Sequence, residues 1–186
     1  MNSNQQTVAK VMHAIEDHFE DAVARLQAIL RVPSISTDPA HVSDVRAAAE
    51  WFDREFKSLG FSCEVVDTPG HPVVFAERKA ASEDAPTVLY YGHYDVQPAD
   101  PLDQWNSPPF EPVIVDDANG GRIVARGAVD DKGQVMTFIE AFRAWIDATG
   151  EIPVSVKVML EGEEESGSES LGGFLDAFAD RLAADV

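Results

Sequence analysis

The chain has 186 residues, of which 45% are hydrophobic and 25% are charged, which suits a single globular domain with a core of its own. Its 33 acidic residues outnumber 14 basic ones, giving a net charge of -19, and no basic cluster is present, so nucleic acid and anionic membranes are not expected as partners. Cys63 is the single cysteine, no long apolar run could span a membrane and no secretory signal opens the chain, which together favour the cytoplasm.

Two helices are predicted in the N-terminal part of the chain. Apolar residues recur at intervals of three and four from Gln6 to Leu30, which predicts one amphipathic helix that Pro33 stops. A second helix is expected from Ser43 to Leu59, with Gly60 at its C-terminal end. The aromatic residues expected to face the core from this second helix are Trp51, Phe52 and Phe56.

Strands and helices alternate in the rest of the chain. Strand-like runs cover residues 62–67, 72–78, 87–92 and 153–160. Residues 111–127 are predicted to form a hairpin that closes through Asn119, Gly120 and Gly121. The order of elements predicts an α/β fold, in which helices flank a mixed β-sheet.

Two further helices are expected between and after these strands. One begins near Lys132 and ends at Gly150, and the last runs from Glu169 to Ala183. The residues predicted to form the core-facing side of the first of these are Val135, Phe138, Ile139, Phe142 and Ile146.

The first candidate motif is "GHYDV", in which His93 and Asp95 follow a buried strand. Side chains two residues apart in an extended chain point the same way, so the imidazole and the carboxylate can lie side by side. A histidine that binds a metal ion commonly has its other ring nitrogen held by a carboxylate. The alternative is an ordinary hydrogen-bonded histidine at the end of a strand.

The second motif is "VDDKG", in which Asp130 and Asp131 separate the hairpin from the next helix. An aspartate before a helix is a preferred N-cap, and Gly133 could simply ease the turn. The functional alternative is a carboxylate that bridges two cations with its two oxygens.

The third motif is "LEGEEESGSE", in which Glu163, Glu164 and Glu165 stand at the exit of a buried strand. A solvated loop could carry three such charges, and the run from Ser166 to Glu169 could be a capping box for the last helix. However, all three motifs come just after predicted strands, and the ends of parallel neighbours meet at one edge of a sheet. A His, an Asp and a Glu that converge there would form a mixed nitrogen and oxygen metal site.

Four segments, "GHYDVQPAD", "WNSPPFEP", "GRIVARGAVDDKGQ" and "LEGEEESGSE", also resemble a known family in their order and spacing. This family is that of the dinuclear zinc metallopeptidases, which includes carnosinase, aminoacylase, glutamate carboxypeptidase and succinyl-diaminopimelate desuccinylase. The similarity extends from "VPSIST" to the last residue, and "DDKG" and "EGEEESGS" are closer to the carnosinase-like dipeptidase branch. The resemblance implies a zinc-exopeptidase-like catalytic domain, of which residues 1–186 form an incomplete N-terminal part.

Residue by residue, the resemblance implies that His93 binds one metal ion, Glu165 binds the other and Asp130 bridges both. It also implies that Asp95 supports the His93 ring, that Glu164 is the general base and that the peptide bond between Asp130 and Asp131 is cis. Two divalent ions are expected. Zinc suits an imidazole among carboxylates, and manganese or cobalt is also compatible with this donor set.

The implied activity is metal-dependent hydrolysis of the peptide bond of dipeptides or short peptides, with water activated by the ions and Glu164 exchanging its proton. An acidic ligand on the next strand and a late histidine are expected beyond Val186, together with an inserted lid domain through which the full-length protein forms a homodimer. Residues 1–186 alone are therefore expected to be inactive. Deacylation of N-acyl amino acids at the same site and a noncatalytic cation-binding or interaction module are the alternatives.

Overall fold

The computed structural model describes residues 3–116, 118 and 120–186. Its helices and strands follow one another as the sequence predicts, with helices first and then an alternation of strands and helices. The helices are α1 (Ser3–Asp17), α2 (Phe19–Leu30), α3 (Val42–Ser58), α4 (Lys132–Thr149) and α5 (Leu171–Leu182). The strands are β1 (Ser62–Val66), β2 (Val73–Arg78), β3 (Thr87–His93), β4 (Val113–Val115), β5 (Arg122–Val124) and β6 (Ser155–Glu161).

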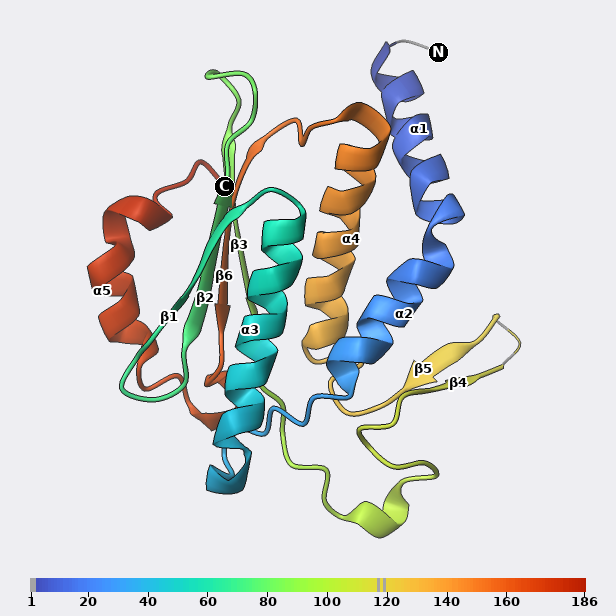
Figure 1. The fold of residues 1–186 in the computed structure, drawn as a ribbon, viewed down its shortest axis with the longest axis vertical. Coiled ribbons are helices and arrows are strands. Elements are labelled where there is room, and N and C mark those ends of the chain that lie inside the picture. Colours follow the sequence, from blue (N-terminus) through green and yellow to red (C-terminus); the bar gives the residue numbers. More distant parts are fainter. Residues whose placement is uncertain (1–2, 117, 119) are drawn as a thin grey trace.

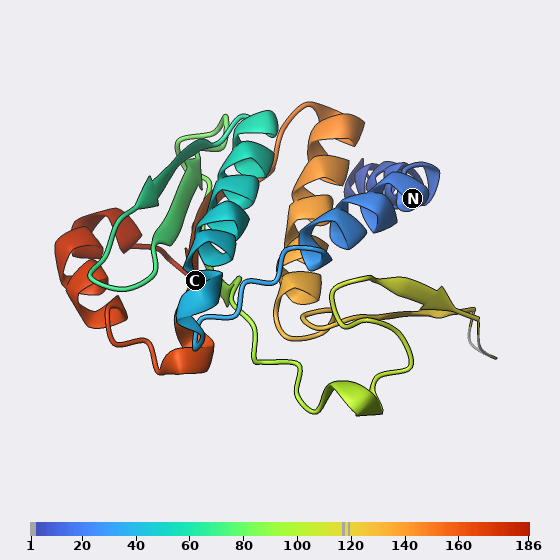
Figure 2. The same ribbon diagram turned by 60° about the horizontal axis from the view of Figure 1, so that its bottom comes forward.

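The central sheet has the strand order β1-β2-β6-β3. Strand β3 runs parallel to β6, whereas β2 pairs with β1 and with β6 in the antiparallel sense. Strands β4 and β5 form a separate hairpin, which Figures 1 and 2 show apart from the central sheet. The prediction of a mixed sheet flanked by helices is therefore confirmed.

Alternation along the strands explains why helices cover both faces of the sheet. Val74 and Ala76 of β2 point into a core cluster with Phe52 of α3, whereas their neighbours Val73 and Phe75 pack in a second cluster with Phe174 of α5. Because successive side chains of a strand point to opposite faces, a strand with no polar interruption must be covered on both sides. Helices α3 and α4 therefore lie on one face and α5 on the other (Figure 1).

Some predicted elements differ from the observed ones. The single helix expected from Gln6 to Leu30 is two helices, because the chain turns at His18 and both parts then lie against α4. The apolar period of three and four continues through this bend, so periodicity alone could not reveal it. Phe138 was expected in the core, but it is 44% exposed, because its ring contacts Tyr90 of β3, which is an edge strand of the sheet.

Other expectations hold at the ends of elements. Gly60 ends α3 and Gly150 ends α4, both with positive φ. The hairpin of β4 and β5 is present and includes Gly120 and Gly121, while Asn119, which was expected in its turn, lies outside the described residues. None of the helices in the described part of the chain combines the length and the apolar character needed to cross a membrane.

Candidate metal centre

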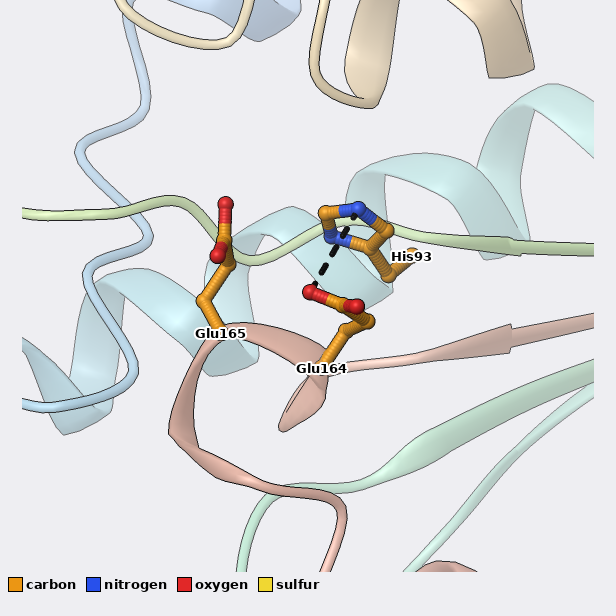
Figure 3. Close-up of side chains that lie close together, drawn as sticks. All are labelled: His93, Glu164 and Glu165. Atoms are coloured by element: carbon orange, nitrogen blue, oxygen red, sulfur yellow. Dashed lines mark ion pairs between the residues drawn. The ribbon is translucent and has the colours of Figure 1, made fainter.

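Two of the three motifs meet at one end of the central sheet. His93 is the last residue of β3 and is paired with Glu161, the last residue of the parallel strand β6. The chain then turns through Gly162 into a short 3-10 helix, Glu164–Ser166, which brings two carboxylates beside the imidazole. Figure 3 shows the side chains of His93, Glu164 and Glu165 close together, with the ion pair between His93 and Glu164 dashed. The expected convergence of the first and third motifs is present.

Asp130 reaches the same place by another route. It follows the separate hairpin and precedes α4, so it does not come from a strand of the central sheet as the sequence interpretation supposed. Its Oδ1 atom lies 3.0 Å from Nε2 of His93, and its peptide bond to Asp131 is cis, as the family resemblance implied.

Asp131 occupies the N-cap position of α4, as the sequence allowed, but its side chain does not cap the helix. Its side chain makes no capping hydrogen bond, and Oδ2 instead accepts the main-chain N–H of His93 at 3.1 Å. A Cβ atom on Gly92 would lie 2.8 Å from that oxygen, so glycine before His93 is what allows this close approach. Burial and the neighbouring Asp130 raise the pKa of Asp131, and His93 partly opposes this.

Asp95 connects the histidine to the glutamates. Its side chain is fully buried, and Oδ1 lies 3.3 Å from Nδ1 of His93. The same carboxylate accepts the main-chain N–H groups of Glu164, at 3.3 Å, and of Glu165, at 3.0 Å. One buried carboxylate therefore orients the imidazole and fixes the backbone that carries both candidate carboxylates.

The electrostatics of the site favour a bound cation. Burial alone would lower the pKa of His93, but its hydrogen bond to Asp95 and the surrounding carboxylates outweigh this effect and raise that pKa to about 9. Burial also raises the pKa of Glu164, and the neighbouring carboxylates add to this although His93 opposes it. In the absence of a metal ion the cluster thus holds a proton on His93, which a divalent cation would displace.

The donor atoms fit a divalent metal ion. His93, Glu164 and Glu165 each offer a ligand atom, and these atoms all lie within 4.8 Å of one another. Together with Asp130 they supply one imidazole nitrogen and several carboxylate oxygens, which is a donor set that zinc and manganese accept. Glu164 was expected to be a base and not a ligand, but its Oε2 atom lies 4.0 Å from Nε2 of His93, which is close enough for both to bind the same ion.

Two residues near these donors were not found by the sequence interpretation. Gln97 donates a hydrogen bond from Nε2 to Oε2 of Glu165 at 2.7 Å, and so orients that carboxylate. Glu163, one of three charges that a solvated loop could carry, is buried: its carboxylate accepts the main-chain N–H groups of His71 and Ser170. The solvated interpretation of Glu163 is wrong. The capping box that the run from Ser166 to Glu169 could have formed is absent, because α5 starts at Leu171 with no side-chain cap.

Lys132, at the start of α4, is the largest departure from what its residue type suggests. It is fully buried, and Nζ donates hydrogen bonds to the main-chain oxygens of Ile29, at 3.3 Å, and Val32, at 2.6 Å. Lys132 therefore joins the end of α2 to the junction that carries Asp130. Burial lowers its pKa to about 7, and the carboxylates of Asp95 and Asp44 offset this only in part.

This lowered pKa predicts a pH-dependent stability. A lysine with a folded-state pKa near 7 and an ordinary value of 10.5 binds fewer protons when folded, so its contribution to the free energy of unfolding rises with pH between these values. We expect the free energy of unfolding of the wild-type protein, minus that of Lys132→Met, to rise by about 1 kcal/mol per pH unit above pH 7. Urea unfolding at pH 7, 8 and 9 measures it, with exposed Lys10→Met as the control. The prediction would be contradicted if the free energies of unfolding of the wild type and Lys132→Met changed equally with pH.

Comparison with known proteins bears on this site. The sequence matches peptidase family M20/M25/M40 over residues 89–186, which is more than half of the chain. The chain belongs to peptidase family M20/M25/M40. This membership confirms the resemblance to metallopeptidases, and the matched region contains all five candidate site residues. They are His93, Asp95, Asp130, Glu164 and Glu165.

Curated members of the M20 family include dipeptidases that resemble this chain over most of its length. The Cys-Gly metallodipeptidase dug1 of Schizosaccharomyces pombe is 32% identical over 97% of this chain and 39% of that protein. The Beta-Ala-His dipeptidase of Mus musculus is 31% identical over 87% of this chain and 35% of that protein. The chain therefore spans less than half the length of these relatives.

Solved structures of family members have the same fold. Human carnosine dipeptidase 1 superposes with a TM-score of 0.83 and 29% identity, over 94% of this chain and 38% of that one. The di-peptidase Dug1p of Saccharomyces cerevisiae gives a TM-score of 0.82 and 31% identity, over 92% and 38% of the two chains. The expected fold class is confirmed by these likenesses.

Proposed function

We propose that the chain is part of a metal-dependent peptidase that hydrolyses the peptide bond of dipeptides or short peptides. The observation that supports this most directly is the cluster of His93, Glu164 and Glu165, whose ligand atoms lie within 4.8 Å of one another beside Asp130. The names of the M20 relatives, which are Cys-Gly and Beta-Ala-His dipeptidases, support the choice of dipeptides.

The proposed roles follow the chemistry of each side chain. His93 and Glu165 would each hold one of two divalent ions, and the two oxygens of Asp130 would be shared between them. Asp95 would keep the imidazole in the orientation that presents Nε2 to an ion. An imidazole among carboxylates favours zinc, and we propose two zinc ions with manganese or cobalt as the alternatives.

Glu164 is proposed as the general base. Divalent ions bound at this site would polarise the substrate carbonyl and lower the pKa of a water molecule. The Glu164 side chain is 45% exposed, so it is accessible to water, and its raised pKa favours uptake of a proton. The same carboxyl group would then return the proton to the amine that leaves.

The domain assignment is a proposal too. Val186 N–H donates to the oxygen of Thr87 at 3.3 Å, and the oxygen of Val186 accepts from Leu89 N–H at 2.8 Å, which is the pattern of a parallel strand next to β3. The curated relatives are also more than twice as long as this chain, which covers 39% and 35% of them. We propose that residues 1–186 form the N-terminal part of a catalytic domain, with further ligands and a lid and dimerisation domain elsewhere in a longer cytoplasmic protein.

The experiment is a comparison of substrates with the full-length protein. We expect it to cleave dipeptides such as Cys-Gly at least about tenfold faster, in kcat/KM, than N-acetyl or N-succinyl amino acids, and to lose this activity in a chelator. One M20 relative, from Azoarcus sp., is a succinyl-diaminopimelate desuccinylase, so preference for the acyl amino acids would favour deacylation. Binding of zinc without cleavage of either class would favour a noncatalytic module.

A further inference from the structure

Glu163 is held differently from the two glutamates that follow it. Both oxygens of its carboxylate accept main-chain N–H groups at 2.9 Å from residues outside the cluster: Oε1 from His71, in the turn between β1 and β2, and Oε2 from Ser170, just before α5. Its main-chain oxygen accepts the N–H groups of Ser166, at 3.0 Å, and Ser168, at 2.8 Å.

The turn between β1 and β2 is shaped around this carboxylate. A Cβ atom on Gly70 would lie 1.6 Å from Oε1 of Glu163, so no side chain fits there without displacing the carboxylate. Gly70 N–H also donates to Oγ of Ser170 at 3.0 Å, and Nε2 of His71 lies 3.0 Å from the oxygen of Ser36. Segments far apart in the sequence therefore meet at one buried glutamate.

The segment that carries Glu164 and Glu165 is thus anchored on two sides. Asp95 accepts the main-chain N–H groups of both residues from the side of β3, and Glu163 joins the other side to the β1–β2 turn and to α5. We propose that Glu163 is a positioning residue that fixes this segment and thereby sets the affinity of the cluster for a divalent ion. The inference rests on the proposed function only for its kinetic readout.

The chemistry of the contacts makes glutamine the informative substitution. Both partners of Glu163 are donors, so two acceptor oxygens are required. An amide offers one acceptor, and its NH₂ group would face a second N–H group without a bond. Glu163→Gln therefore keeps the size of the side chain and removes one half of the anchor.

Glu169→Gln is the matched control. Glu169 is exposed and lies on the same segment, and within the described residues its carboxylate has no hydrogen bond or salt bridge. Both substitutions remove one negative charge near the cluster, but the control leaves the anchor in place. A second pair tests the same idea without changing a charge: Gly70→Ala crowds the Glu163 carboxylate, whereas Gly172→Ala meets no atom within 4 Å.

The measurements are made on the full-length protein, with Zn²⁺ alone as the ligand. We expect Glu163→Gln and Gly70→Ala to weaken Zn²⁺ binding about tenfold, and Glu169→Gln and Gly172→Ala to stay within about twofold of the wild type. Amide hydrogen exchange at His71 and Ser170 should accelerate in Glu163→Gln and Gly70→Ala and stay unchanged in the two controls. For hydrolysis of a dipeptide at saturating zinc, kcat should fall with KM unchanged.

Three results would overturn the inference. These are unchanged exchange at His71 and Ser170 in Glu163→Gln, unchanged Zn²⁺ affinity despite faster exchange, and equal weakening by Glu163→Gln and Glu169→Gln, which would mean that charge alone matters. If Glu163→Gln fails to fold, the same criteria apply to Gly70→Ala. If the wild-type protein cleaves no dipeptide, but Glu163→Gln and Gly70→Ala still weaken Zn²⁺ binding relative to their controls, the inference is retained and the proposed function is rejected.

Discussion

Glu164→Gln in the full-length protein is expected to lower kcat for dipeptide hydrolysis by about 10²–10⁴-fold while leaving the zinc content nearly unchanged. The carboxylate lies 4.0 Å from Nε2 of His93, and burial together with its acidic neighbours raises its pKa, which suits a group that takes up and returns a proton. Glutamine keeps the size of the side chain but cannot carry the proton. Metal analysis after gel filtration, combined with steady-state kinetics, measures both effects.

The cluster geometry makes this experiment decisive for the role of Glu164. Because its carboxylate is near enough to His93 and Glu165 to be a ligand as well, position alone does not separate a ligand from a base. Glu169→Gln, in which an exposed carboxylate of the same segment is lost, is the charge-matched control and should change neither readout. A parallel loss of zinc and activity in Glu164→Gln would assign Glu164 to the metal ions and leave the base elsewhere.

The fold was predictable because its elements leave local signatures. Alternating apolar residues mark the buried strands, and Gly60 and Gly150 end helices in a conformation that other residues rarely adopt. Those signatures report which side of an element is buried but not which segment covers it. The bend at His18 and the exposure of Phe138 therefore depend on packing against α4 and β3, which no local pattern contains.

The residues of the candidate site were also predictable only in part. Adjacency to strand ends was sufficient to bring the first and third motifs together, whereas Asp130, which was expected from a neighbouring strand of the same sheet, approaches from the separate hairpin. Residues that act through long-range main-chain contacts were not found. Lys132 and Glu163 belong to residue types that are rarely buried. Both partners of Lys132, and His71 among the partners of Glu163, lie 92 to 103 residues away in the sequence.

The role of Asp95 leads to the second large effect. Its buried carboxylate lies beside Nδ1 of His93 and accepts the main-chain N–H groups of Glu164 and Glu165. Asparagine has one acceptor oxygen, so its NH₂ group would face at least one of these donors at a position with no exposed surface. We expect Asp95→Asn to weaken zinc binding by about 10–100-fold and to lower kcat as well.

Zinc titration of the full-length variant measures this loss, and Asp103→Asn, which removes an exposed carboxylate outside the cluster, is the control. An unchanged zinc affinity in Asp95→Asn would show that the imidazole and the glutamate segment hold their positions without it. The two substitutions are expected to differ in kind. Because Asp95 positions donors while Glu164 exchanges a proton, excess zinc should restore part of the activity of Asp95→Asn and none of the activity of Glu164→Gln.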